Sequence, residues 1–265
     1  MHKRVLFICS TILVLALAVN CGGGGEQTTN IPPAGGAAGP AGGGAFDLSK
    51  ANASLSGKIV FDGTPPPNEK IQMSADPYCA SHSQMPLTET VKVSDGGLEN
   101  VIVYVKAGLP AGATFATPAD AVTIDQHDCH YVPHVFTIQV NQPLKIKNSD
   151  STLHNIHAWA EKNMPFNIGQ PVQNMVSEKK FDKEEMPLPI RCDVHKWMGA
   201  FVGVFSHPFH TVSKQGGAYD LKLPAGNYEI VAWHEKFGTQ SQMVEVKDNE
   251  KKDLSFTFKE TKTTD

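Results

Sequence analysis

The chain has 265 residues, of which 23 are Lys or Arg and 27 are Asp or Glu, so its formal net charge is −4 at pH 7. This charge argues against nucleic acid and anionic membrane surfaces as partners, because both attract basic proteins. It is compatible with a basic protein partner. The length is sufficient for one or two domains with hydrophobic cores of their own.

The N-terminus has the pattern of an export signal. Two basic residues precede an apolar run over 5–19, which is shorter than the ~20 residues that a membrane-spanning helix needs. Cys21 follows, and an apolar run that ends at a cysteine resembles a bacterial lipoprotein signal. We therefore expect residues 1–20 to be a signal peptide and Cys21 to carry a lipid, in the bacterial cell envelope or periplasm. Asn20 departs from the usual small residue, so a plain secreted protein is the alternative.

Residues 21–53 have the character of a tether. The stretch over 22–45 consists mainly of Gly, Ala and Pro and cannot bury a core. A flexible segment of this length reaches about 25–30 Å on average. Membrane contact would then pass through the lipid anchor only. We expect the folded part to begin near Ser54.

From there the sequence predicts β-strands. Runs rich in β-branched and aromatic residues, separated by turn signals, occur at 54–67, 98–108, 134–150, 199–207, 218–235, 241–248 and 252–259. Short strands at this spacing are typical of β-sandwiches. No segment has a long helical period, and at most a short helix fits residues 177–186. The predicted fold class is all-β.

Three cysteines remain beyond residue 21. They are Cys79, Cys129 and Cys192. In an oxidising compartment two of them can pair. Cys192 is followed at three-residue intervals by His195 and Met198, which are donors that suit a metal. Cys79–Cys129 is therefore the predicted disulfide.

A histidine partner for this loop is expected within the segment "KNSDSTLHNIH", residues 147–157. His154 and His157 are three positions apart, and side chains at this spacing on a strand point to opposite faces. Only one of them can therefore join Cys192. We choose His154, because Asn155 follows it where a new strand begins.

Together, these two segments resemble the cupredoxins, the small blue-copper proteins. The similarity is closest to the amicyanin type, in which a histidine followed by asparagine is combined with a loop of pattern Cys-x-x-His-x-x-Met. The resemblance covers residues 121–206 and implies a Greek-key sandwich there. It implies four copper ligands, namely His154, Cys192, His195 and Met198. Asn155 then corresponds to the asparagine that steadies the ligand loop. Lys196 and Trp197 stand where the family often has proline and an aromatic residue.

The resemblance implies one type 1 copper centre that transfers single electrons. A thiolate and two imidazoles bind copper in a plane, and a distant thioether completes the site. Sulfur favours Cu(I) and imidazole accepts Cu(II), so both states are held with little rearrangement. We expect the protein to be an electron carrier and not an enzyme. Its partners would be redox proteins such as a c-type cytochrome. These would dock at an exposed edge of His195, beside Trp197 and Met198.

The flanks of this region resemble a second family, the carboxypeptidase regulatory-like or transthyretin-like β-sandwich. Its most specific feature is the run "YDLKLPAGNY" at 219–228. The early strands lie in 54–110 and the late ones in 207–259. We therefore expect one sandwich built from both parts and split by the copper domain, with two domains in series as the alternative. That family is generally non-catalytic.

The sequence also permits other functions. A copper-handling protein would bind and release metal, and exposed Met and His clusters would favour it over a closed set of four ligands. A metal-free interaction module would make the Cys192 loop a packing feature, because Cys and Met are common in cores. A second metal site near His127, His130 and His134 also stays open.

Overall fold

The computed structural model of the protein describes residues 44–84 and 86–260. Over this range the chain is nearly all β-structure, which confirms the predicted fold class. The helices described are short, namely α1 (Pro77–His82) and the 3-10 helices η1 (Leu48–Lys50) and η2 (Gln215–Gly217). Within the same ranges no helix is long and apolar enough to cross a membrane. The predicted signal peptide, residues 1–20, and the predicted lipid site, Cys21, lie outside the described residues.

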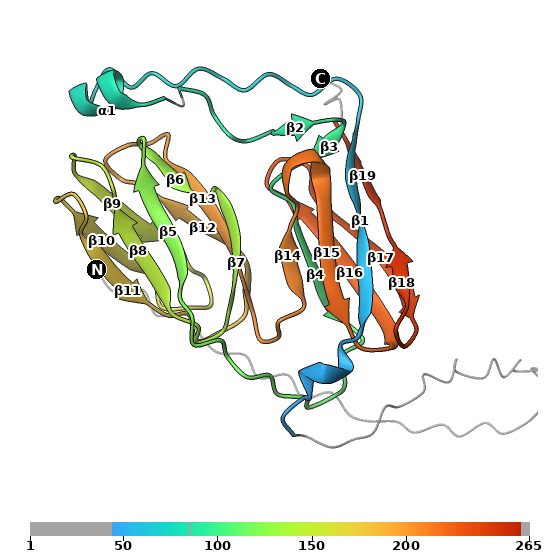
Figure 1. Cartoon of the computed structure of the whole chain (residues 1–265). Helices are drawn as coiled ribbons and strands as arrows, with labels where there is room; N and C mark the ends of the chain where they lie inside the picture. Colours follow the sequence, from blue (N-terminus) through green and yellow to red (C-terminus); the bar gives the residue numbers. More distant parts are fainter. Residues whose placement is uncertain (1–43, 85, 261–265) are drawn as a thin grey trace, which may run out of the picture. The chain divides into compact units, whose positions relative to one another are not determined.

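Residues 122–205 form a β-sandwich, which we call the central sandwich. Its strands are β5 (Val122–His127), β6 (His130–Val132), β7 (Val135–Gln139), β8 (Leu144–Asn148), β9 (His154–Ala158), β10 (Phe166–Gln170), β11 (Val176–Lys179), β12 (Glu185–Arg191) and β13 (Gly199–Phe205). They form two sheets, of order β10-β9-β12-β13-β7 and β11-β8-β5-β6 (Figure 1). The pairs β13–β7 and β5–β8 are parallel, and the other pairs are antiparallel.

Alternating hydrophobicity explains how these strands bury their core. In β8, Leu144 and Ile146 are buried whereas Lys145 between them is exposed, as expected when successive side chains point to opposite faces. In β12, Leu188 and Ile190 alternate in the same way. The buried faces of both sheets meet in one hydrophobic cluster that also includes Cys192.

Helix formation differs from expectation at two places. Residues 177–186, where the sequence permits a short helix, instead form β11, which pairs with β8, and the start of β12. By contrast, α1 was not predicted. Asp76 caps α1, because its carboxylate accepts the backbone N–H groups of Tyr78 and Cys79 at 2.7 and 3.1 Å, and Pro77 suits the first turn.

Strands from both sides of the central sandwich build a second one, which we call the flanking sandwich. Its early strands are β1 (Ala53–Asp62), β2 (Val93–Ser94), β3 (Gly97–Leu98) and β4 (Ile102–Ala107). Its late strands are β14 (His210–Val212), β15 (Ala218–Leu223), β16 (Gly226–His234), β17 (Gly238–Val246), β18 (Lys251–Asp253) and β19 (Phe256–Lys259). One sheet has the order β15-β1-β3-β2, with β18 and β19 also on β1, and the other has the order β14-β4-β16-β17 (Figure 1). Both sheets join early to late strands, although membership of the carboxypeptidase regulatory-like family stays a prediction.

The folded part begins before Ser54, where we expected it to start. Phe46 donates its backbone N–H to the carbonyl of Thr114 at 2.8 Å. Its ring lies 5.3 Å from that of Phe115 and 6.2 Å from that of Phe209, measured between centroids. The expected tether over 21–53 therefore overlaps the fold at its C-terminal end, because one aromatic side chain there reaches the core of the flanking sandwich.

The two sandwiches share an apolar contact. Ile102 of β4, Val135 of β7 and Phe205 of β13 are buried together in one cluster. Beside it, the imidazole of His134 pairs with the carboxylate of Glu235. Burial of these side chains fixes the flanking strands against the central ones.

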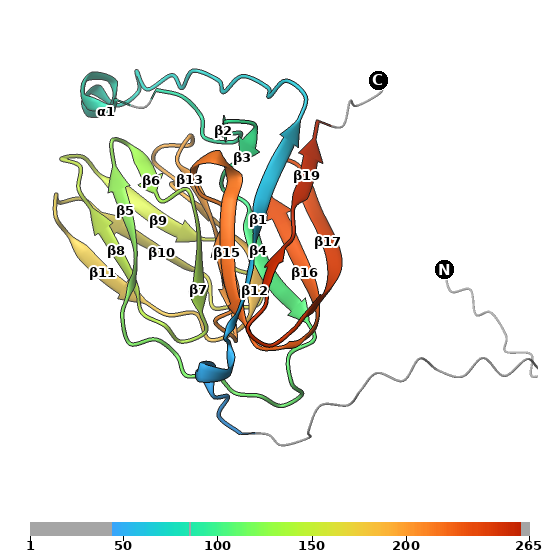
Figure 2. The same ribbon diagram turned by 45° about the vertical axis from the view of Figure 1, so that its right-hand side comes forward.

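Between β1 and β2 the chain makes a long excursion that returns to the central sandwich. Residues 71–84, which include α1 and which we call the covering segment, lie at the end of the central sandwich where β6 lies (Figures 1 and 2). A disulfide between Cys79 and Cys129 joins this segment to the turn between β5 and β6. It confirms the predicted pairing.

The strand pairing predicts that the early strands do not fold alone. A fragment of residues 44–116 contains β1 but lacks β15, β18 and β19, which supply most of its hydrogen-bonded neighbours. By circular dichroism it should show no cooperative thermal transition, whereas residues 44–260 should unfold cooperatively. A cooperative transition in the fragment would contradict the split sandwich.

Candidate metal centre

Two neighbouring strands of one sheet bring the predicted ligands together. His154 is the first residue of β9, and Cys192 directly follows β12. β9 pairs with β12, and β12 pairs with β13 across the loop that contains His195. The loop and the start of β9 therefore lie at the same end of the sheet.

The donor atoms of His154, Cys192 and His195 lie within 4.8 Å of one another. The two Nδ1 atoms are 2.9 Å apart, and the sulfur of Cys192 is 3.9 Å from Nδ1 of His195. The three residues are 0%, 1% and 2% exposed. Of the two histidines considered, the structure brings His154 to the thiol.

Two ring nitrogens at this separation need a proton between them, since two lone pairs would repel. One Nδ1 donates and the other accepts. Burial lowers the pKa of His154, but the carboxylate of Asp150 and the sulfur of Cys192 outweigh this effect and raise it. A metal ion that replaced the shared proton would find two imidazole lone pairs and a sulfur already facing it.

The surroundings of Cys192 favour the ionised form of its side chain. Burial raises the pKa of Cys192, but hydrogen bonds with His154, His195 and the backbone outweigh it and lower the pKa to about 5. The thiolate therefore predominates at neutral pH, and the thiolate is the form that binds metals.

Backbone hydrogen bonds close the ligand loop. The N–H of Met198 donates to the carbonyl of His195 at 2.9 Å, and the carbonyl of Met198 accepts the N–H of Cys192 at 3.2 Å. Met198 is 1% exposed and packs in the same core as Cys192. This placement is compatible with an axial thioether, and ligation by Met198 stays a prediction.

Asn155 holds the loop from β9. Its Oδ1 accepts the backbone N–H groups of Asp193 at 2.7 Å and of Val194 at 3.3 Å, and it lies 3.3 Å from the sulfur of Cys192. Its Nδ2 donates to Asn167 at 2.6 Å. One amide thereby fixes the start of the loop relative to the strand that carries His154.

Each histidine ring is also held at its far nitrogen by a carboxylate. Nε2 of His154 is 2.9 Å from Oδ2 of Asp150, and Nε2 of His195 is 2.9 Å from Oδ2 of Asp76. Sequence reasoning missed both aspartates. The signal available was Asp76 before Pro77, which is typical of a helix N-cap, but nothing local relates it to His195.

Hydrogen bonds stabilise the ionised form of Asp76. Burial raises its pKa, but donation from Thr152, from the backbone N–H of Cys79 and from His195 outweighs this and lowers the pKa to about 2. For Asp150, burial raises the pKa, but hydrogen bonds from His154 and from backbone N–H groups outweigh it and lower the pKa. Both carboxylates are therefore charged at neutral pH.

His195 does not have the exposed edge that the sequence predicted. The covering segment lies over its ring, with the sulfur of Cys79 at 3.9 Å from Nε2. On the other side, the indole of Trp197 lies 4.9 Å away between ring centroids and donates its N–H to the carbonyl of Cys129. The expected docking patch at His195 and Met198 is thus buried, because a segment distant in sequence packs on it.

The remaining histidines lie outside the cluster. The side chain of His157 is 29% exposed and faces the carboxylate of Asp193 at 3.1 Å. His134 contacts Glu235 and the carbonyl of Gly199. Among the residues that the structure describes, His127, His130 and His134 do not converge on one metal-sized site.

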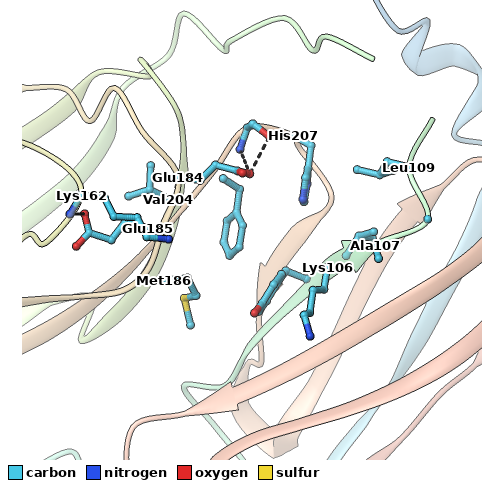
Figure 3. Close-up of a pocket in the computed structure, with 14 residues that line it drawn as sticks. Lys106, Ala107, Leu109, Lys162, Glu184, Glu185, Met186, Val204 and His207 are labelled. Atoms are coloured by element: carbon cyan, nitrogen blue, oxygen red, sulfur yellow. Dashed lines mark hydrogen bonds between the residues drawn. The ribbon is translucent and has the colours of Figure 1, made fainter. Parts of the chain in front are cut away.

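A cavity of about 440 Å³ lies away from the cluster, between β4 and the β12–β13 pair (Figure 3). Its carboxylates are already engaged. Glu184 accepts the N–H and the hydroxyl of Ser206 at 2.8 and 2.7 Å, and Glu185 accepts three backbone N–H groups. None of its lining residues belongs to the candidate metal centre.

No protein-family model and no curated protein sequence matches the chain. Solved structures that match part of the chain include a copper-containing nitrite reductase from Thermus scotoductus SA-01, at 18% identity and a TM-score of 0.31 over 37% of this chain and 25% of that one. A purple cupredoxin from Nitrosopumilus maritimus matches at 24% identity and a TM-score of 0.28 over 32% of this chain and 99% of that one. A Cu(I) amicyanin variant matches at 17% identity and a TM-score of 0.29 over 40% and 99%.

The match spans only a quarter of the nitrite reductase chain. At these TM-scores the neighbours support no argument about the fold or the function of this chain. The argument about function therefore depends on the residues of this chain.

The contacts of Asn155 predict a measurable loss of stability. Asn155→Ala removes the acceptor of two partly buried N–H groups of the loop, and two such hydrogen bonds together contribute about 1–3 kcal/mol. We expect the metal-free protein to lose that much free energy of unfolding in a urea titration. Asn227→Ala, at an exposed position of β16, is the control. Equal losses in both variants would contradict the role of Asn155.

Proposed function

We propose that the protein carries single electrons in the cell envelope by means of one type 1 copper ion bound to His154, Cys192, His195 and Met198. The observation that carries this proposal is the convergence of a low-pKa thiol and two imidazole Nδ1 atoms in a buried pocket. A thiolate and two imidazoles with a weak axial thioether are the donors of blue-copper sites. Copper bound there would supply a one-electron couple.

The chain's own contribution is to hold these donors in place. Asn155 fixes the loop, and two carboxylates hold the far sides of the imidazoles. Ligands held this firmly need little rearrangement when the oxidation state changes. That property favours rapid electron exchange.

A copper-handling role fits the arrangement less well. A protein that delivers metal needs ligands that open to an acceptor, whereas this cluster is buried beneath a segment joined by the Cys79–Cys129 disulfide. A metal-free interaction module is the other alternative. Core packing alone would not require two imidazoles and a thiol to face one another.

Burial of His195 changes where a redox partner would dock. Trp197 contacts its ring and is itself only partly buried, beside the exposed Lys196. We propose that a partner such as a c-type cytochrome approaches the surface around Trp197. Attachment to a membrane through Cys21 alone, after export directed by residues 1–20, belongs to the same proposal.

The visible spectrum tests the ligand set. The soluble protein with added Cu(II) should give an intense thiolate-to-copper band that ascorbate bleaches and reoxidation restores. Cys192→Ser should abolish the band, because serine oxygen does not supply this transition. His157→Ala, which alters a histidine outside the cluster, should leave the spectrum unchanged. Loss of the band in His157→Ala would mean that His157, rather than His154, binds the copper.

The axial position makes a separate prediction. Met198→Gln should keep copper but lower the reduction potential, because an amide oxygen stabilises Cu(II) more than a thioether does. Spectroelectrochemical titration measures the change. Met243→Gln, at a methionine that is 73% exposed in β17, should not alter the potential. An unchanged potential in Met198→Gln would exclude Met198 from the site.

A further inference from the structure

The ring of His195 is held by a residue from a distant part of the chain. Asp76 lies in the covering segment, 119 positions before the histidine, and its Oδ2 is 2.9 Å from Nε2. The same oxygen accepts the hydroxyl of Thr152 at 2.8 Å. The other oxygen, Oδ1, accepts the N–H groups of Tyr78 and Cys79. Both oxygens of this carboxylate therefore have fixed donors.

These contacts determine how the imidazole is protonated. A carboxylate that accepts hydrogen bonds from several donors holds the proton of the ring at Nε2, so Nδ1 keeps its lone pair. That lone pair points into the cluster, 2.9 Å from Nδ1 of His154 and 3.9 Å from the sulfur of Cys192. Outer partners of this kind generally fix the tautomer of a metal-binding histidine and tune its basicity.

We propose that Asp76 is a positioning residue for the metal centre, which keeps His195 in the tautomer with Nδ1 free and favours the oxidised metal through its negative charge. This inference rests on the proposed function. It gives the covering segment a role beyond excluding water, because the segment delivers the charge that sets the electronic properties of the site.

Asp150 makes a corresponding contact with the other ligand histidine. It holds Nε2 of His154 at 2.9 Å and accepts the backbone N–H groups of Asp128 and Cys129 at 3.0 and 2.8 Å. Asp150, however, lies four residues from its histidine within the central sandwich. Asp76 reaches its histidine only when the covering segment is docked.

The variant Asp76→Asn removes the negative charge and one of the two acceptor oxygens. Asparagine caps helices about as well as aspartate does, but it has a single acceptor oxygen, so with that oxygen at the cap its NH₂ group faces Nε2 of His195. The control is Asp128→Asn, which removes one charge nearby. Among the described residues, no hydrogen bond joins the Asp128 carboxylate to either ligand ring.

Spectroelectrochemistry of the copper-loaded protein is the first measurement. We expect Asp76→Asn to keep the thiolate-to-copper band and to shift the preference of the site towards Cu(I) about tenfold, which is a rise in potential of about 59 mV for a one-electron couple. Asp128→Asn should shift it much less. Equal shifts in both variants, or no shift in Asp76→Asn, would overturn the proposal.

The second measurement does not need copper. Two-dimensional ¹H–¹⁵N spectra of the metal-free protein should show His195 as the tautomer protonated at Nε2 in the wild type, and Asp76→Asn should lose this preference. Protonation at Nδ1 in the wild type would overturn the role of Asp76. If the wild type gave no blue band with copper, the proposed function would fail, and the tautomer would still decide whether Asp76 positions His195.

Discussion

Burial of a thiol beside two imidazoles imposes a constraint that shapes the surrounding structure. Polar groups removed from water need hydrogen-bond partners, because an unpaired one costs free energy. In this chain the partners of His154, Cys192 and His195 are Asp150, Asn155 and Asp76. Each is anchored by backbone N–H groups. The site is consequently rigid before any metal binds, and its donors already face one another.

One of these partners comes from a segment between two strands of the flanking sandwich. The excursion between β1 and β2 belongs in sequence to the flanking sandwich, yet it ends on the metal loop of the central one. The disulfide from Cys79 to Cys129 and the contact of Asp76 with His195 hold it there. Because β1 is paired to late strands, the flanking sandwich is built from chain on both sides of the central one. The covering segment therefore connects a strand of the flanking sandwich to the site in the central one.

Local patterns predicted the parts of the site that are close in sequence. Alternating hydrophobicity was sufficient for the all-β class, and the spacing of Cys192, His195 and Met198 was sufficient to identify the loop. Side chains three positions apart on a strand point to opposite faces, and this rule allowed only one of His154 and His157 to join Cys192. Counting cysteines gave the disulfide.

What the sequence could not supply were contacts between distant segments. The covering segment buries His195, but no periodicity in residues 71–84 indicates where it docks. The local sequence of Asp76 suits a helix cap and that of Asp150 suits a turn, and the structure has them in these places. Their second contacts, with the two imidazoles, arise only from tertiary packing. The strand at 176–179 likewise depends on its pairing with β8 rather than on its own polar sequence.

The central claim is that one thiolate and two imidazoles of this chain form a copper site. X-ray absorption at the copper edge, on the intact protein loaded with one equivalent of Cu(II), tests it most directly. The account predicts one short copper–sulfur shell and two imidazole nitrogens, with the sulfur shell lost in Cys192→Ser. A first shell of oxygen and nitrogen only, unchanged by that substitution, would contradict it.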